Sequence, residues 1–374
     1  MKNRLACLDI MRGVAALMVC ADHLRAFLLM DNARLQHPSL INKIFYFATG
    51  LGHEAVVIFF VLSGFFVGGG VVKAFSQNKW SWKQYAIRRL SRLWIVLLPA
   101  LLLTLAFDLA GQHLAPAAYS GEYHTIYNSG PALDEPADWR FSTFLGNSFF
   151  LQTITSPVFG TNGPLWSLAN EFWYYLLFPL LLGIFKLPKW PGKILSLSLV
   201  GLLVIWLPKY ILFLGLVWLL GVAVYLASQN SWFKKNGGKL GFLVFTGFLA
   251  LGSLALTKLI SMNWAEEYVV GIAFTLFIAC LSVRNFESVS FAKVATALGE
   301  TTYTLYLTHF PLLALIFFVG FKGQKMQPGL MGGLWFLGLL VVVLSFTTLV
   351  WWCFERNTDR IRKWLETRLI QSPH

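Results

Sequence analysis

The sequence has too few charged residues for a soluble protein of its length. Asp, Glu, Lys and Arg make up 13% of the 374 residues, whereas apolar residues make up 57% and aromatic residues 16%. About a quarter of the residues in an average soluble domain are charged, so this chain lacks the polar surface that water requires. Long apolar runs recur from near the N-terminus almost to the end. We therefore expect an integral membrane protein without a sizeable separate soluble domain.

Cysteine is scarce as well, and its spacing matches neither a metal site nor a disulfide framework. The four cysteines are Cys7, Cys20, Cys280 and Cys353. All lie inside or at the ends of apolar runs, without the short paired spacing of a metal site. We expect them to be ordinary packed residues, and we expect no metal cofactor. The sequence also lacks an internal repeat, which disfavours transporters built from inverted repeats.

Acidic residues are few, because 17 Asp and Glu stand against 30 Lys and Arg and the net charge is +13. A basic protein can bind nucleic acid, but here the basic residues form short clusters between apolar runs rather than one basic face. Such clusters are typical of membrane topology signals. We therefore expect a lipid bilayer, and not nucleic acid, as the partner of these residues.

Ten apolar segments are long enough to cross a bilayer, which takes about 20 residues or somewhat fewer. They are residues 8-28, 50-72, 93-110, 164-185, 194-208, 211-227, 240-258, 267-283, 298-320 and 331-353. A break near Pro208 decides between two short helices and one long one. With two helices and a cytoplasmic N-terminus, 22 of the 30 Lys and Arg lie inside and 8 outside, whereas one merged helix leaves nearly equal numbers. The positive-inside rule therefore favours an all-α polytopic fold of about ten transmembrane helices with both termini cytoplasmic.

We expect a membrane domain at residues 1-353 and a cytoplasmic tail at residues 354-374. A long loop of the membrane domain and the tail itself lie outside the spans. Residues 111-163 form a long outer loop that is rich in acidic and aromatic side chains. They include Glu122, Asp134, Glu135, Asp138, Tyr119, Tyr123, Tyr127 and Trp139. Contact with a sugar and a merely solvated cap both fit this composition. The tail is basic and amphipathic, and anionic lipid headgroups are sufficient to explain it.

Ionisable side chains inside the spans are candidate functional residues, because burying one in a bilayer costs several kcal/mol unless it is paired. Arg12 and His23 are eleven residues apart in the first span, so on a helix they return to nearly the same face about 16 Å apart. A neutral histidine there can take a proton from a hydroxyl group. The alternatives are a histidine bonded to backbone or to Asp22, and an Arg12 that anchors the inner end or pairs with Asp9.

Three further polar residues inside spans have two interpretations each. Glu171 lies at a depth similar to that of His23 and can orient the imidazole or bind an acceptor, or it can form a buried hydrogen bond. His309 precedes Pro311, which frees backbone groups that a nearby polar side chain can satisfy. Ser63 is a nucleophile only if a base lies beside it, and with Gly64 it can instead mark close helix packing.

A basic segment opens the third span on the expected cytoplasmic side. Arg88, Arg89 and Arg92 lie in RRLSRLW, and the last two share a helical face because they are three residues apart. Planar guanidinium groups can grip the phosphates of a donor such as coenzyme A. Lipid phosphates are the alternative ligand, and the spacing alone does not separate the two.

Six segments, taken in order, resemble the acyltransferase-3 family of integral-membrane O-acyltransferases. They are LDIMRGVAALMVCADH (8-23), FFVLSGFF (59-66), RRLSRL (88-93), PLWSLANEFWYYLLFP (164-179), LGETTYTLYLTHFP (298-311) and WWCFER (351-356). Each segment is weak evidence alone, but six in one order are specific. Asn357 stands where the family usually has a proline, a small variation outside the predicted site.

The resemblance implies an enzyme of the bacterial inner membrane that transfers an acyl group, commonly acetyl, from acyl-CoA to an envelope or secreted carbohydrate. It implies that Arg12, His23, Arg89 and Arg92 matter for activity and makes a role for Glu171 plausible. Some members carry an extracytoplasmic hydrolase-like domain, whereas we expect a stand-alone membrane domain that acts alone, as a homo-oligomer or with a partner enzyme. The rival functions are a flippase of a lipid-linked sugar and a non-catalytic membrane subunit.

Overall fold

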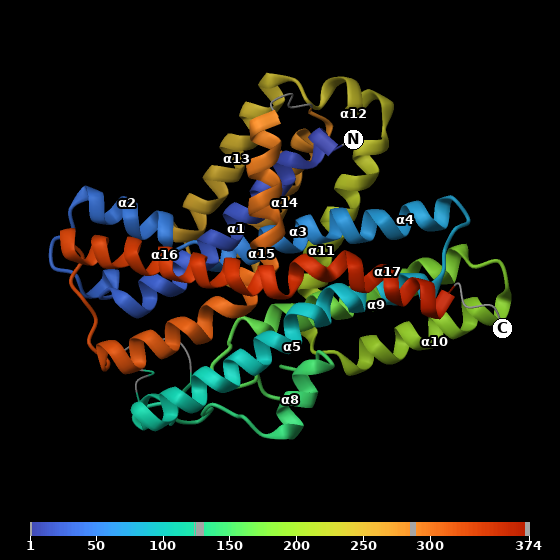
Figure 1. The fold of residues 1–374 in the computed structure, drawn as a ribbon. Coiled ribbons are helices and arrows are strands. Elements are labelled where there is room, and N and C mark those ends of the chain that lie inside the picture. The colour runs from blue at the N-terminus through green and yellow to red at the C-terminus, as the bar shows by residue number, and fades with distance from the viewer. Residues whose placement is uncertain (1, 123, 125–130, 285–288, 371–374) are drawn as a thin grey trace. The chain divides into compact units, whose positions relative to one another are not determined.

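The structure is a computed structural model that describes residues 2–122, 124, 131–284 and 289–370. Figure 1 shows that these residues form helices joined by turns and loops, with the most extended loops around α8. The helices are α1 (Lys2–Leu28), α2 (Leu40–Thr49), α3 (Gly52–Ser63), α4 (Gly69–Ser76), α5 (Trp82–Leu114), α6 (Pro116–Tyr119), α8 (Phe141–Ser148), α9 (Leu165–Lys186), α10 (Trp190–Trp206), α11 (Lys209–Gln229), α12 (Ser231–Asn236), α13 (Leu240–Leu259), α14 (Ala265–Val283), α15 (Val289–Leu315), α16 (Leu330–Cys353) and α17 (Thr358–Ile370), with the short helical turns η1 (Asn32–Arg34), η2 (Gly64–Gly68), η3 (Ile316–Phe321) and η4 (Glu355–Asn357).

The described residues contain eight helical segments that are long and apolar enough to cross a membrane. They are Leu40–Ser76, Trp82–Leu114, Leu165–Lys186, Lys209–Gln229, Leu240–Leu259, Ala265–Val283, Ala297–Phe321 and Leu330–Ile370. The other two predicted spans are also helical, as α1, which contains several charged residues, and as the shorter α10. The prediction of an all-α polytopic membrane protein is therefore confirmed.

The predicted break near Pro208 is also confirmed. α10 ends at Trp206 and α11 begins at Lys209, and between them Leu207 and Pro208 are extended, with ψ angles of 140° and 141°. A residue that precedes proline is pushed out of the α region by the proline ring, which explains why the helix ends here. The two short helices are thus separate elements.

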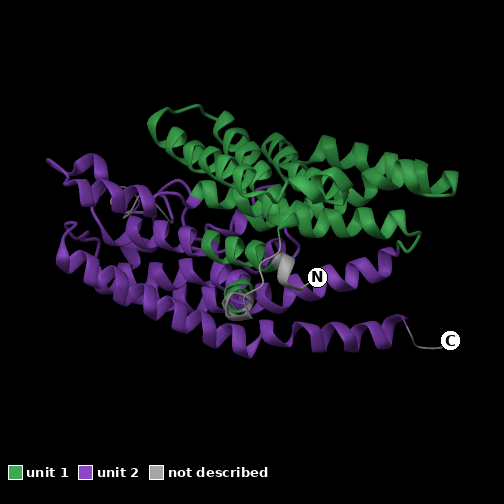
Figure 2. Ribbon diagram, turned by 90° about the horizontal axis from the view of Figure 1, so that it is seen from above, with its two compact units in different colours: residues 1–15, 53–80, 167–299 green, residues 16–52, 81–166, 300–374 purple. Residues whose placement is uncertain are grey.

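The chain forms two compact units, which are coloured separately in Figure 2 and are described separately below. The first unit comprises Met1–Ala15, His53–Trp80 and Ser167–Gly299. The second unit comprises Ala16–Gly52, Ser81–Trp166 and Glu300–His374. His23, His309 and the three arginines of RRLSRLW belong to the second unit, whereas Arg12, Ser63 and Glu171 belong to the first.

Close helix packing in the first unit explains the glycine of FFVLSGFF. A Cβ atom on Gly64 would collide with the carbonyl oxygen of Trp218, and one on Gly221 would collide with that of Val61. The backbones of η2 and α11 therefore meet without intervening side chains, as small residues permit in membrane helices. Gly64 has the packing role that its position in the middle of a span allows.

The predicted loop at 111-163 begins slightly later than expected, because α5 continues to Leu114. We call residues 115–164 the α5–α9 segment, and it contains α6 and α8. Two of its aromatic residues face inward, since Tyr119 is buried and Trp139 donates a hydrogen bond to Asp108. Tyr123 and Tyr127, also candidates for sugar contact, lie outside the described residues.

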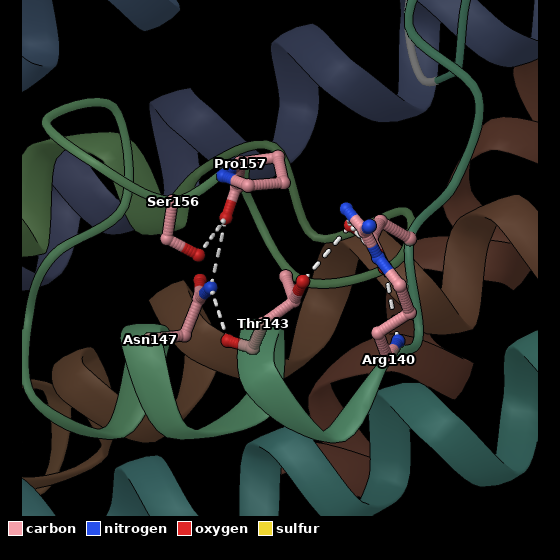
Figure 3. Close-up of polar contacts among 6 residues, drawn as sticks. Arg140, Thr143, Asn147, Ser156 and Pro157 are labelled. Carbon is pink, nitrogen blue, oxygen red and sulfur yellow. Dashed lines mark hydrogen bonds and ion pairs between the residues drawn. The ribbon is translucent and has the colours of Figure 1, made fainter.

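Buried amides shape the α5–α9 segment from within. Figure 3 shows the side chain of Asn147 on α8, whose Nδ2 donates to the carbonyl oxygens of Thr143 and Pro157, both at 2.9 Å. Its Oδ1 accepts from the backbone N–H of Phe159 at 3.1 Å. Because every hydrogen-bonding atom of this amide has a partner inside the segment, Asn147 holds the loop after α8 in place.

Candidate functional site

The two histidines that the sequence singled out lie side by side in the second unit. Nδ1 of His23 on α1 is 2.9 Å from Nε2 of His309 on α15, and the two rings stack with centroids 5.2 Å apart. His309 is buried, and His23 is half-buried with its ring edge-on to Phe310. The chain separation of 286 residues hides this pair from any local motif. Only the packing of α1 against α15 reveals it.

The hydrogen-bond network assigns the protons of the histidine pair when both rings are neutral. The carbonyl oxygen of Leu305 can only accept, so Nδ1 of His309, 2.8 Å away, carries a hydrogen and donates it. A neutral imidazole has one N–H, so Nε2 of His309 must accept the hydrogen of His23 Nδ1. The lone pair of His23 Nε2 is then available. This nitrogen can accept a proton from a substrate hydroxyl.

The backbone group that Pro311 frees is satisfied by Asn162 and not by His309. Proline has no N–H, so the carbonyl oxygen of Leu307, four residues earlier on α15, loses its helical partner. Nδ2 of the buried Asn162 donates to that oxygen at 2.9 Å. His309 is thereby left for its contact with His23.

Two charged neighbours on α1 are paired within their own turns. Asp22 is the side chain considered as an alternative partner of His23. It forms an ion pair with Arg25, whose Nη2 lies 2.6 Å from Oδ1 of Asp22. Arg12 lies 3.6 Å from Asp9 and 5.7 Å from the centre of the Phe66 ring, within the first unit. The pairing of Arg12 with Asp9 that the spacing allowed is present. Arg12 and His23 do share one helix, as predicted.

An arginine of α5 meets the carboxylate of the WWCFER segment. Arg92 lies 3.8 Å from Oε1 of the buried Glu355, whose Oε2 accepts from the backbone N–H of Thr304 at 3.2 Å and from its hydroxyl at 2.6 Å. Three of the six segments that carry the family resemblance, RRLSRL, WWCFER and LGETTYTLYLTHFP, are therefore in contact here. Thr304 and His309 are five residues apart on α15, about 7.5 Å along the axis. Helix α15 thus connects Arg92 to the histidine pair through Thr304 and Glu355.

The other two arginines of this group differ in their surroundings. Arg88 is half exposed and forms a 3.0 Å ion pair with Glu366 of α17. Arg89 places its guanidinium 5.9 Å from the centre of the Tyr85 ring, and its Nε is buried without a hydrogen-bond partner in the described part of the chain. The exposed fractions of the Arg88 and Arg92 side chains are 48% and 42%, so a phosphate group can reach both.

The remaining predicted residues lie in the first unit. Glu171 is half-buried on α9 of the first unit, whereas His23 belongs to the second unit. Its action on His23 therefore stays a prediction. The Ser63 hydroxyl receives the indole N–H of Trp218 at 3.1 Å and lies 3.1 Å from the hydroxyl of Tyr175. Neither partner is a base at neutral pH, so these contacts favour a packing role for Ser63 over a nucleophilic one. Within the described ranges, no group of three or more His, Cys, Asp or Glu side chains could hold a metal ion.

Sequence reasoning missed a buried carboxylate that anchors the α5–α9 segment. Oδ2 of Asp108 accepts from the backbone N–H of Thr161 at 2.7 Å and from the indole of Trp139 at 3.0 Å, and its Oδ1 accepts the Thr161 hydroxyl at 2.7 Å. An ionisable residue inside a predicted span was the signal that could have identified it. Asn162 and Thr304 were also missed, because an amide or a hydroxyl gives no comparable signal in a sequence, and Glu355 was missed because it lies in the predicted tail, outside the spans.

Comparison with known proteins identifies the family of the chain. The sequence matches the family model of the acyltransferase-3 family, described as "Acyltransferase domain", over residues 5–356. An "Uncharacterized protein" of Haemophilus influenzae is 33% identical over 131 residues, which are 33% of this chain and 47% of that protein. A protein of Acidianus two-tailed virus named "Putative acetyltransferase ORF330" is 27% identical over 185 residues, 46% of this chain and 54% of that protein.

The alignments span about half the length of these curated relatives, and no solved structure matches. The family model, in contrast, covers nearly the whole chain and includes all six of the segments on which the resemblance rested. The protein therefore belongs to the acyltransferase-3 family of membrane acyltransferases.

Proposed function

We propose that the protein transfers an acyl group, commonly acetyl, from acyl-coenzyme A to a hydroxyl group of an envelope or secreted carbohydrate in the bacterial inner membrane. The observation that carries the proposal is the free lone pair of His23 Nε2, which follows from the hydrogen bonds of His309 to Leu305 and to His23. A general base of this kind is what activation of a sugar hydroxyl requires.

The reaction we infer is a direct transfer. His23 Nε2 takes the proton of the acceptor hydroxyl while the hydroxyl oxygen attacks the carbonyl carbon of the thioester. The carbon–sulfur bond then breaks, and the departing coenzyme A thiolate receives from His23 the proton that the acceptor lost, so that the ester and free coenzyme A are formed. While His23 is protonated, the hydrogen bond from its Nδ1 to His309 Nε2 is charge-assisted and therefore stronger than in the resting state. His309 thus stabilises the charge that develops on the base.

The donor is placed by its phosphates. Arg88 and Arg92 are exposed enough to meet a polyanion, and guanidinium groups bind phosphate oxygens in pairs. Arg92 is tied through Glu355 and Thr304 to the helix that carries His309. The thioester end of a donor bound there can extend toward the histidine pair. The importance of Arg12 for activity and the action of Glu171 on the imidazole or the acceptor remain predictions from the sequence.

A covalent route is the second path for the same residues, because His23 Nε2 can itself attack the thioester and form an acyl-histidine. Rapid-quench labelling of the purified protein with radioactive acyl-coenzyme A separates the paths. Label that stays on the protein without acceptor and disappears in His23→Ala favours the covalent route. Label that never appears on the protein during turnover favours direct transfer.

The decisive experiment is mass spectrometry of envelope glycans from cells with the wild-type gene, with the deleted gene and with the His23→Ala variant. We expect one acyl mass difference that only the wild type restores, and it identifies both the acyl group and its acceptor. Glycan acylation by the purified protein with acyl-coenzyme A excludes a flippase and a non-catalytic subunit. Full activity of His23→Ala would refute the mechanism.

A further inference from the structure

Asn162 joins three elements at a buried point of the second unit. Its Nδ2 donates to the carbonyl oxygen of Leu307 on α15 at 2.9 Å and to the hydroxyl of Thr104 on α5 at 3.1 Å. Thr104 gives its own hydrogen to the carbonyl of Ala100 at 2.8 Å, so its oxygen is free to accept. Both N–H groups of the amide are therefore used, and the orientation of Asn162 is determined.

The carbonyl that Asn162 meets lies in the turn of α15 that holds the histidine ring. Pro311 removes the N–H that would bond to Leu307, and an unsatisfied carbonyl in an apolar interior is costly. Leu307 is midway between Leu305, whose carbonyl accepts from the His309 ring, and His309 itself. A shift of this carbonyl therefore displaces the residues that orient the ring.

The position of Asn162 is in turn fixed from α5. The preceding residue, Thr161, is held by two 2.7 Å hydrogen bonds to Asp108. A continuous set of contacts thus runs from Asp108 through Thr161 and Asn162 to the α15 turn, and from His309 to His23. The amide of Asn162 therefore connects the α5–α9 segment to the helix turn that holds His309.

We propose that Asn162 is a positioning residue that orients His309, and through it the proton-accepting nitrogen of His23, by donating to the carbonyl that Pro311 leaves free. The consequence for rate rests on the proposed function, whereas the consequence for the histidine rings does not. Asn162 touches no reacting atom in this proposal. Its effect is transmitted by one backbone carbonyl and one ring hydrogen bond.

The test compares Asn162→Ala with Asn147→Ala in the full chain in lipid nanodiscs. Asn147 is a matched control because it is equally buried in the α5–α9 segment and also donates twice from Nδ2, but to carbonyls of that segment alone. Nitrogen NMR of histidine-labelled protein reports which ring nitrogens carry hydrogen. We expect Asn162→Ala to change the signals of His23 and His309, assigned with His309→Gln, and Asn147→Ala to leave them unchanged.

Activity gives the second readout. Misplacing a reacting group by about 1 Å can lower a rate about a hundredfold, so Asn162→Ala should lower kcat about ten- to hundredfold with the donor KM within about twofold. Asn162→Asp, which keeps the volume but loses the amide donors, should act in the same direction and covers the case in which the alanine variant does not fold. Equal effects of the Asn162 and Asn147 variants on the histidine signals would overturn the proposal.

Pro311→Ala provides a rescue that a purely structural role would not predict. Alanine at 311 restores the N–H that a helix offers to the Leu307 carbonyl, so the amide of Asn162 is no longer needed there. The double variant Asn162→Ala/Pro311→Ala should therefore regain part of the wild-type histidine spectrum that Asn162→Ala loses. If wild-type protein transfers no acyl group, the proposed function fails while the spectra still decide on Asn162.

Discussion

Arg92 lies 3.8 Å from Glu355, and the same carboxylate accepts two hydrogen bonds from Thr304. The guanidinium is therefore steered by a buried acid that is itself fixed to α15, five residues from His309. An arginine held at one side keeps its other N–H groups for a phosphate. Helix α15 therefore contacts both candidate regions, the arginine Arg92 through Thr304 and Glu355, and the base His23 through His309.

Arg92→Ala should raise the donor KM with little change in kcat, because a phosphate contact far from the thioester contributes to binding and not to bond breaking. A hydrogen bond to a charged group contributes about 1.5–3 kcal/mol, so we expect about a ten- to hundredfold rise. Steady-state kinetics with varied acyl-coenzyme A measures it. Arg360→Ala, which removes an exposed arginine of α17, is the control and should leave KM unchanged. Equal effects of the two variants would indicate a nonspecific loss of positive charge.

Glu366→Gln should lower the donor KM. Glu366 pairs with Arg88 at 3.0 Å and so competes with the donor phosphates for this guanidinium. Exposed ion pairs contribute about 0.2–1 kcal/mol, which limits the gain to about fivefold. Asp359→Asn is the matched control, since Asp359 pairs with Arg362 inside α17. A KM that rises in Glu366→Gln would show that the ion pair assists donor binding instead.

The spans were predictable from sequence because a bilayer imposes a length and a composition on each one. Even the break at Pro208 followed from charge bias, and the extended backbone of Leu207 and Pro208 confirms it. The histidine pair was predictable only as two separate candidates, since no local pattern links residues 286 positions apart. Asn162 was not predictable at all, because its role depends on a carbonyl that Pro311 frees on another helix. The sequence therefore predicted the elements and the candidate residues, but not the contacts between segments that are far apart in the chain.

The α5–α9 segment should lose stability at acidic pH through Asp138. Hydrogen bonds from Arg140 lower the pKa of Asp138 from 3.8 to about 2. A carboxyl group with a lower pKa in the folded state stabilises the fold above its unfolded pKa, and this contribution is lost as pH falls from about 4 through about 2. Hydrogen exchange of α8 amides between pH 5 and pH 2.5 should show this loss in wild type. Asp138→Asn should be less stable at pH 5 and should change less with pH, whereas an equal pH dependence of both proteins would contradict the assignment.

Gly160→Ala should destabilise the protein, and Gly163→Ala should not. Gly160 has a φ of +57°, and a Cβ there would collide with the carboxylate of Asp108, which holds Thr161. The left-handed backbone costs a non-glycine residue about 1–2 kcal/mol, and the collision adds to it. A Cβ on Gly163 would meet no heavy atom within 4 Å, and the φ of this glycine is not positive, so alanine is tolerated there. Thermal unfolding in detergent compares the two variants with wild type.

Since the displaced segment carries Asn162, Gly160→Ala should also change the histidine NMR signals, whereas Gly163→Ala should preserve them. An equal stability of the two alanine variants would mean that the Asp108 contact does not fix the segment.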